Sequence, residues 1–225
     1  MFLEQNLRGL CQQYNMDFFD FLNDMEIDSV DELTFADLQI LCEEYKVDLM
    51  AVLFKPLYLN NNLSDKLSKI KLLILDVDGV MTDGGMYYTE NGDQFKKYNT
   101  KDGMAIQYLV KQNFQIAIIS SGYKAEMVKA RASLLGIQNC HVGREPKLEI
   151  LEKLCIKLNL ELEQVALIGD DINDLEMMKK IGFSACPSDA VDEVKLHSDI
   201  ILKKKGGKAC VREFIDDYLL KCIPI

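Results

Sequence analysis

An apolar run that ends abruptly at two aspartates constrains this chain more than any other feature. Residues 72–75 have the composition of a buried strand, and Asp76-Val77-Asp78-Gly79 follows directly. Groups that bind or react in open α/β sheets lie at the carboxyl ends of strands. If the chain turns at Gly79, both carboxylates can converge on one site, whereas an ordinary Asp-rich turn would leave them in solvent. Later strand ends decide between these two interpretations.

From about Lys69 onward, strand patterns alternate with helical patterns. Strands are expected at 71–76, 115–120, 139–142, 165–169 and 198–202, and helices near 103–112, 124–136, 147–158, 173–181 and 208–221. This alternation predicts an α/β, Rossmann-like parallel sheet with helices on both faces. Asn91-Gly92 between aromatic runs predicts a two-residue β-hairpin. The hairpin would hang over the carboxylates as a flap.

The first part of the chain has a different composition. Residues 1–66 carry four basic and thirteen acidic side chains, a net charge of −9, although the whole chain carries only −10. Apolar residues at helical spacing predict a small all-α domain over 1–66, followed by the second domain over 67–225. A polar linker is expected at 59–64. Residues 37–54 are loosely similar to helix-turn-helix repressors, but the acidic charge disfavours nucleic acid, so we expect a packing or oligomerisation module.

Composition also indicates the cellular compartment in which the protein is expected. The chain has no apolar run long enough to span a bilayer and no signal-peptide pattern, and its acidic charge disfavours anionic membranes, so we expect a cytoplasmic protein without a membrane partner. Seven cysteines, an odd number, are scattered without CxxC spacing. Buried free thiols are therefore expected rather than a zinc site or a disulfide framework.

Groups that suit phosphate and a cation follow three later strand ends. Ser120-Ser121-Gly122 offers hydroxyls and backbone N–H groups before a helix. Lys147 begins another helix and can neutralise a phosphate or an aspartate, although a lone lysine is usually surface charge. The strand at 165–169 leads into Asp170-Asp171-Ile172-Asn173-Asp174, whose carboxylates repel one another unless a cation binds them. Together, these strand ends favour a phosphoryl-transfer site.

The four elements resemble the haloacid dehalogenase-like phosphatase superfamily over residues 70–222. The resemblance implies that Asp76 is the nucleophile that becomes an aspartyl-phosphate and that Asp78 is the general acid and base. Ser121 would bind the phosphoryl group and Lys147 would hold its charge. Counting from the strand favours Ser120 instead of Ser121, and we predict Ser121 because Gly122 follows it. The Mg²⁺ ligands implied are Asp76, Asp78 through its backbone carbonyl, and Asp170, with Asp171 or Asp174 in support.

The predicted site residues lie too close together in the sequence to leave room for a cap domain, the inserted domain that closes over the site in other members of the superfamily. Only 44 residues separate Asp76 from Ser121, and only 22 separate Lys147 from Asp170. An uncapped site is either open to macromolecules or covered by a neighbouring subunit. Segments 76–84, 97–103 and 206–213 are similar to the 3-deoxy-D-manno-octulosonate 8-phosphate phosphatase family. Members of that family form homotetramers, in which flap hairpins pack together and a glycine-rich tail segment reaches a neighbour's site.

This second resemblance implies a Mg²⁺-dependent phosphatase of a keto-acid sugar phosphate, 3-deoxy-D-manno-octulosonate 8-phosphate, in cell-surface sugar biosynthesis. It implies substrate-binding roles for Thr82, Gly122, Lys101, Asp102, Lys208 and Arg212, of which Lys101, Lys208 and Arg212 are candidates for the sugar carboxylate.

Two departures from the family pattern leave alternatives open. Where the octulosonate enzymes usually carry Thr-Gly-Arg, this chain has Ser121-Gly122-Tyr123, which removes a bidentate donor. The flap sequence is at least as close to the nonulosonate branch, so an N-acylneuraminate or nonulosonate 9-phosphate phosphatase is the alternative enzyme. A vestigial phosphatase fold acting as a regulatory or scaffold protein is the alternative of another class. It is disfavoured because competent residues occupy every catalytic position.

Overall fold

The computed structural model describes residues 2–59, 61–92, 94–122 and 124–223. Contacts divide the chain into two compact units, Met1–Ser64 and Asp65–Ile225. Helix α5 (Asn61–Ser68) occupies most of the stretch expected to be a linker, so that prediction was wrong, while Asn60 lies outside the described residues. Within the described part of the chain, no helix is both long and apolar enough to cross a membrane.

The first unit is all-α, as predicted. Its helices are α1 (Leu3–Gln13), α2 (Phe18–Asp24), α3 (Phe35–Glu44) and α4 (Leu49–Phe54), with one turn of 3₁₀ helix at Val30–Glu32. Buried side chains from these helices form one small core: Leu7, Leu10, Cys11, Phe21, Leu22, Val30 and Leu41. The unit therefore has its own hydrophobic centre.

The helix pairs α1–α2 and α3–α4 are connected by turns of the same kind. After α1 the chain turns through Asn15 in the left-handed conformation, and the Asp17 carboxylate caps α2. After α3 it turns through Lys46 in the same conformation, and Asp48 caps α4. Each aspartate satisfies backbone N–H groups that have no partner within their helix. The same chemistry therefore sets the corner of both helix pairs.

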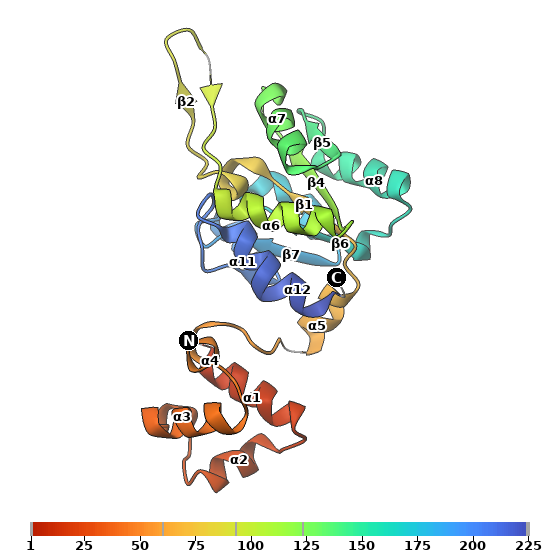
Figure 1. The fold of residues 1–225 in the computed structure, drawn as a ribbon. Coiled ribbons are helices and arrows are strands. Elements are labelled where there is room, and N and C mark those ends of the chain that lie inside the picture. Colours follow the sequence, from red (N-terminus) through yellow and green to blue (C-terminus); the bar gives the residue numbers. More distant parts are fainter. Residues whose placement is uncertain (1, 60, 93, 123, 224–225) are drawn as a thin grey trace. The chain divides into compact units, whose positions relative to one another are not determined.

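The second unit is built on a six-stranded parallel sheet with the order β5-β4-β1-β6-β7-β8 (Figure 1). The strands are β1 (Leu72–Leu75), β4 (Gln115–Ser120), β5 (Asn139–Val142), β6 (Val165–Ile168), β7 (Phe183–Cys186) and β8 (Ile200–Ile201). Strand β1 lies inside the sheet, with Ile74 opposite Ala117 of β4 and Leu167 of β6. Because strands buried on both faces need apolar side chains throughout, this position explains the uninterrupted run before Asp76.

Helices cover both faces of this sheet. They are α6 (Thr100–Lys111), α7 (Ala125–Leu135), α8 (Lys147–Leu158), α9 (Leu175–Met178), α10 (Asp192–His197), α11 (Cys210–Phe214) and α12 (Leu220–Cys222). Leu72 and Ile74 of β1 share a core with side chains from α8, α9 and α10. Alternate residues of a strand face opposite ways, so Leu73 and Leu75 point to the other face. Helices α6 and α11 pack together there (Figure 1).

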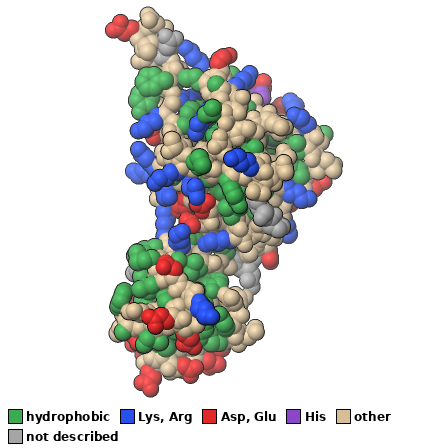
Figure 2. Space-filling model, viewed as in Figure 1, with side chains coloured by type: hydrophobic (Ala, Val, Ile, Leu, Met, Phe, Trp, Pro, Cys, Tyr) green, Lys and Arg blue, Asp and Glu red, His purple; other side chains and the backbone are tan. Residues whose placement is uncertain are grey.

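A β-hairpin of β2 (Tyr87–Tyr88) and β3 (Gln94–Phe95) forms the predicted flap. It projects from the sheet (Figure 1), and apolar side chains are exposed along it (Figure 2). The strands end at Tyr88 and Gln94, so the connection is longer than the two residues expected, and Asp93 within it lies outside the described residues. Of the described residues, those between β1 and β4 form only a turn, the flap and α6, so no cap domain is present there.

Candidate active site

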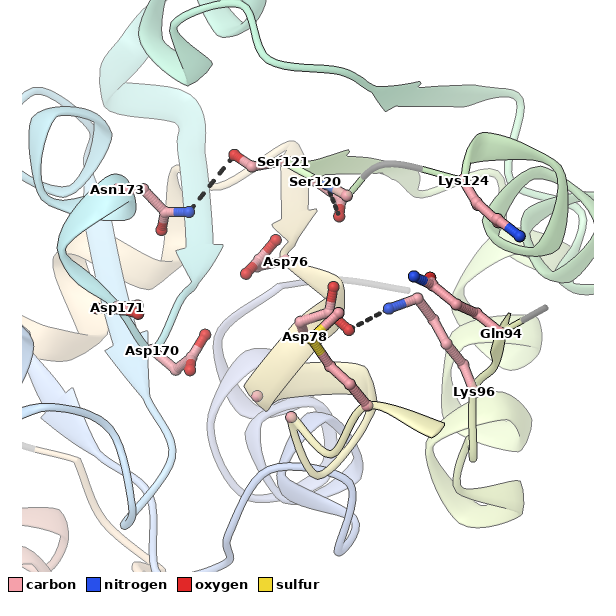
Figure 3. A pocket seen from close by; sticks show the side chains of 14 residues that line it. Asp76, Asp78, Gln94, Lys96, Ser120, Ser121, Lys124, Asp170, Asp171 and Asn173 are labelled. Carbon is pink, nitrogen blue, oxygen red and sulfur yellow. Dashed lines mark hydrogen bonds and ion pairs between the residues drawn. The ribbon is translucent and has the colours of Figure 1, made fainter. Parts of the chain in front are cut away.

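The end of β1 brings two aspartates to one pocket. The Asp76 backbone N–H donates to the Ile168 carbonyl at 3.1 Å, and the chain then turns through Gly79 at φ +84°. A Cβ at position 79 would lie 1.9 Å from Oδ2 of Asp170, so the turn requires glycine for both its conformation and its space. Both Asp76 and Asp78 line the resulting pocket (Figure 3).

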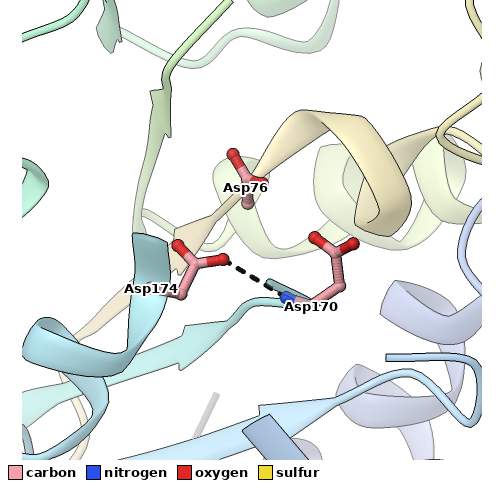
Figure 4. A group of neighbouring side chains, drawn as sticks. All are labelled: Asp76, Asp170 and Asp174. Atoms are coloured by element: carbon pink, nitrogen blue, oxygen red, sulfur yellow. Dashed lines mark hydrogen bonds between the residues drawn. The ribbon is translucent and has the colours of Figure 1, made fainter. Parts of the chain in front are cut away.

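The end of β6 supplies two further carboxylates. The Asp170 backbone N–H donates to Oδ2 of Asp174 at 3.2 Å, which holds the two residues together. One carboxylate oxygen each from Asp76, Asp170 and Asp174 lies within 4.8 Å of the others (Figure 4). Two strand ends, joined side by side in the sheet, therefore build one acidic cluster.

Lys147 connects this cluster from the start of α8. Its Nζ lies 3.0 Å from Oδ1 of Asp76 and 2.8 Å from Oδ1 of Asp174, and its side chain is only 3% exposed. Burial, and then the charge of Asp174, raise the pKa of Asp76 to about 7 despite Lys147. Burial and the charge of Asp76 raise the pKa of Asp170 to about 8. One ammonium is therefore not enough to stabilise three ionised carboxylates.

The residues present fit a divalent cation. Oδ1 of Asp170 is buried and has no hydrogen-bond partner in the described part of the protein. Buried polar atoms normally have partners, and a buried carboxylate oxygen without one is a candidate metal ligand. Hard carboxylate oxygens suit Mg²⁺. Asp171 is exposed, and its carboxylate accepts the Ile172 N–H at 2.7 Å, so it stabilises the turn at the rim of the cluster.

The pocket itself encloses about 460 Å³, which is enough for a sugar phosphate. It is lined by Asp76, Asp78, Gly79, Gly84, Met86, Gln94, Lys96, Ser120, Ser121, Gly122, Lys124, Asp170, Asp171 and Asn173. Carboxylates occupy its inner end, and residues of the flap and of the segment that leads into α7 border it elsewhere (Figure 3).

The two candidate phosphate-binding serines, Ser120 and Ser121, both line the pocket, but their surroundings differ. Ser120 is the last residue of β4 and is 2% exposed, and its Oγ accepts the Gly122 N–H at 3.3 Å. Ser121 is half-buried, and its Oγ accepts from Nδ2 of Asn173 at 3.4 Å. The choice of Ser121 as the phosphate ligand stays a prediction. Tyr123, the residue that departs from the family pattern, lies outside the described residues.

Five of the six residues predicted to bind substrate do not line the pocket of the single chain. They are Thr82, Lys101, Asp102, Lys208 and Arg212, whereas Gly122 does line it. Thr82 is buried and its hydroxyl donates to the Val77 carbonyl at 3.2 Å, so it supports the turn after β1. Asp102 is 2% exposed and accepts the Arg212 N–H at 2.7 Å, and burial raises its pKa to about 6.

Lys101, Lys208 and Arg212 are the residues predicted to bind the sugar carboxylate. Lys101 and Lys208 are exposed, and the Arg212 guanidinium pairs with Asp216. Thr82 and Asp102 support the fold around this chain's own pocket without lining it, and the substrate-binding roles of all five residues stay predictions.

The glycine-rich segment near the C-terminus packs on its own chain. The Gly207 N–H donates to the Val80 carbonyl at 2.9 Å, and Asn99 donates through Nδ2 to the Gly207 carbonyl at 3.0 Å. The segment thus contacts the turn that carries Asp78. Gly206-Gly207 therefore support this chain's own turn, and the contact of this segment with a neighbour's site stays a prediction.

Sequence reasoning missed four polar residues that line the pocket: Gln94, Lys96, Lys124 and Asn173. Gln94 and Lys96 are two positions apart in an extended segment, so their side chains share a face. That spacing, on a hairpin expected to cover the site, was the available signal.

Comparison with known proteins agrees with this geometry. The family model for haloacid dehalogenase-like hydrolases matches residues 143–215, which include Lys147 and the Asp170–Asp174 segment. Fold and site together define a haloacid dehalogenase-like hydrolase, with no cap domain among the residues that the structure describes.

Individual relatives identify the family to which this chain belongs within that class. The 3-deoxy-D-manno-octulosonate 8-phosphate phosphatase of Salmonella typhi is 39% identical over 155 residues, 69% of this chain and 82% of the relative. The Moraxella catarrhalis enzyme of that name, solved with magnesium, phosphate and a KDO molecule, is 35% identical and matches with a TM-score of 0.70 over 73% of this chain and 94% of that one. A cobalt-bound Haemophilus influenzae enzyme matches with a TM-score of 0.66 at 35% identity, over 70% and 91%. This chain belongs to the 3-deoxy-D-manno-octulosonate 8-phosphate phosphatase family.

Proposed function

We propose that this chain is a Mg²⁺-dependent phosphatase that hydrolyses 3-deoxy-D-manno-octulosonate 8-phosphate through an aspartyl-phosphate. The observation that carries the proposal is Lys147 bridging Asp76 and Asp174 at the ends of two adjacent strands, with an unpartnered oxygen of Asp170 beside them. Family membership supplies the substrate. The geometry supports the proposal that Asp76 is the nucleophile, that Asp78 is the acid and that Asp170 binds the cation.

Asp76 is the proposed nucleophile. Its carboxylate is held at the inner end of the pocket by the Lys147 ammonium at 3.0 Å. A carboxylate oxygen of Asp76 forms the new bond to phosphorus as the bond from phosphorus to the sugar oxygen breaks. Mg²⁺ would be held by Asp76, by the backbone carbonyl of Asp78 and by Asp170, with Asp171 or Asp174 in support. Bound there, it would reduce the repulsion between the phosphate and the carboxylates.

Asp78 is the proposed general acid and base. It is two residues from the nucleophile and lines the same pocket, and its side chain is 40% exposed, whereas that of Asp76 is 6% exposed. In the first step its carboxyl proton passes to the departing sugar oxygen. In the second step it takes a proton from the water that attacks phosphorus, the bond between phosphorus and the Asp76 oxygen breaks, and phosphate is released. Ser121 and the backbone N–H groups around Gly122 would bind the phosphoryl oxygens.

We also propose a homotetramer that assembles through the flap. Met86, Tyr88 and Phe95 on the hairpin are each more than half exposed. Exposed apolar patches of this kind mark interaction sites. Assembly would bring cations such as Lys101, Lys208 and Arg212 toward a neighbouring pocket. We place the enzyme in the cytoplasm, because Cys11, Cys42, Cys140, Cys155, Cys186 and Cys210 are free thiols.

A substrate panel tests this function. We expect kcat/KM for 3-deoxy-D-manno-octulosonate 8-phosphate to exceed that for a nonulosonate 9-phosphate, and both activities to disappear when Mg²⁺ is chelated. The reverse preference would assign the chain to the nonulosonate branch, to which its flap sequence is similar. Equally feeble rates on both sugars, unaffected by Asp76→Asn, would support the scaffold alternative.

A further inference from the structure

A lysine of the flap contacts the proposed general acid. Lys96 follows β3, and its side chain points into the pocket, where Nζ donates to Oδ1 of Asp78 (Figure 3). The Lys96 side chain is only 11% exposed, while that of Asp78 is 40% exposed. A surface lysine would leave its ammonium in water. Here the ammonium is turned inward and shielded by the pocket walls.

The hairpin that carries Lys96 is held to the rest of the site at a second point. Lys124, just before α7, donates through Nζ to the Gly92 carbonyl in the hairpin turn at 2.9 Å. The hairpin therefore contacts the site at its turn and at its base, both within one chain. Two contacts of this kind give Lys96 a defined position over Asp78.

The two aspartates after β1 have different lysine partners. Lys147 binds Asp76 and Asp174, and Lys96 binds Asp78. The second oxygen of Asp78, Oδ2, faces the loop at residues 120–122, since a Cβ at Gly122 would lie 3.9 Å from it. With Oδ1 occupied by the ammonium, the oxygen left for proton transfer is the one that faces the loop.

We propose that Lys96 is a positioning residue for proton transfer. Its ammonium fixes Oδ1 of Asp78, so that Oδ2 carries the proton toward the departing oxygen. In that step the bond between Asp76 and phosphorus forms, the bond from phosphorus to the sugar oxygen breaks, and the Asp78 proton goes to that oxygen. The inference rests on the proposed function, because it takes Asp78 to be the acid.

Leaving-group dependence provides the test. The ratio kcat/KM reports only the steps up to departure of the leaving group. A sugar alkoxide must be protonated as it leaves, whereas p-nitrophenolate is stable without a proton. We therefore expect Lys96→Met to lower kcat/KM for the sugar phosphate by about tenfold or more, part of the range for general acid catalysis. For p-nitrophenyl phosphate the same substitution should change kcat/KM by less than about threefold, and Lys96→Arg should restore part of the loss.

The matched control is Lys97→Met. Lys97 is the next residue, is exposed and does not line the pocket, so its substitution should affect neither substrate. Equal losses on both substrates for Lys96→Met would overturn the proposal, because they would show that Lys96 binds the phosphate itself. Unchanged kcat/KM on both would overturn it as well.

Failure of the proposed function would be seen separately. Wild-type enzyme that cleaves p-nitrophenyl phosphate but not the octulosonate ester would disprove the substrate, and a simple hexose phosphate would then take its place in the Lys96 comparison. Mg²⁺ affinity and circular dichroism of each variant, unchanged from wild type, confirm an intact fold.

Discussion

At the residue scale, protons and a cation compete for the same carboxylates. The pKa of Asp76 is raised to about 7 and that of Asp170 to about 8, chiefly by burial. Mg²⁺ binds the ionised forms, so lowering the pH through these values fills the site with protons and opposes the metal. We expect the Kd for Mg²⁺, measured by titration calorimetry, to weaken about tenfold or more between pH 8 and pH 6.

Proton release gives this prediction an independent control. Repeating the titration in two buffers of different ionisation enthalpy reports how many protons Mg²⁺ displaces. We expect release at pH 7 and none near pH 9, where both carboxyl groups are already ionised. A Kd that does not depend on pH, with no proton release at pH 7, would contradict the raised pKa values.

The two serines make a natural pair of variants. Ser121→Ala should lower kcat/KM by roughly a hundredfold, the order found for loss of one preorganised donor to a developing anion. Ser120→Ala should instead affect stability, by about 1 kcal/mol, because its buried Oγ accepts the Gly122 N–H. Steady-state kinetics and thermal unfolding of both variants separate the two roles. The opposite result would assign the phosphate contact to Ser120.

At the scale of elements, a C-terminal segment supports the catalytic turn. A Cβ at Gly206 would lie 1.8 Å from the Gly79 carbonyl oxygen and 3.0 Å from that of Thr82. Both contacts are backbone, so no side chain can move aside. We expect Gly206→Ala to lower stability by about 1–3 kcal/mol and to reduce kcat/KM, because the turn that carries Asp78 must shift.

Gly92→Ala is the matched control for this prediction. Gly92 also has a positive φ, at +78°, but nothing lies within 4 Å of its Cβ position. Alanine there should cost only about 1 kcal/mol of backbone strain. Thermal unfolding and activity of the two variants are the measurements, and equal activity of Gly206→Ala and wild type would show that the segment does not position the turn.

Most strands of the second unit were predicted from the sequence. Strands β1, β4 and β6 are apolar runs because they lie inside the sheet. These runs were recognised in the sequence, and the aspartates and serines that follow them were therefore predicted as site residues. Strand β7 (Phe183–Cys186) was missed, since Ser184 interrupts its short apolar run. Lys96 was missed for another reason: the spacing of Gln94 and Lys96 places both side chains on one face of the flap, but the contact of Lys96 with Asp78 depends on where the hairpin folds.

At the scale of the whole molecule, we expect four chains to assemble through the exposed apolar side chains of the flap. Light scattering should give a mass four times the 25.7 kDa of one chain. Tyr88→Lys, at a position 57% exposed on the flap, should reduce this mass, whereas Leu196→Lys, at a position 79% exposed on α10, should not. A Tyr88→Lys variant that stays tetrameric would place assembly elsewhere, the acidic first unit included.

Covalent capture at Asp76 tests the central claim most directly. The enzyme is mixed with 3-deoxy-D-manno-octulosonate 8-phosphate and Mg²⁺, quenched in acid within the first turnover, digested and analysed by mass spectrometry. The account predicts one phosphoryl group on the peptide that contains Asp76, and none in the Asp76→Asn variant. A phosphoryl group on another residue, or turnover of this substrate by Asp76→Asn, would contradict it.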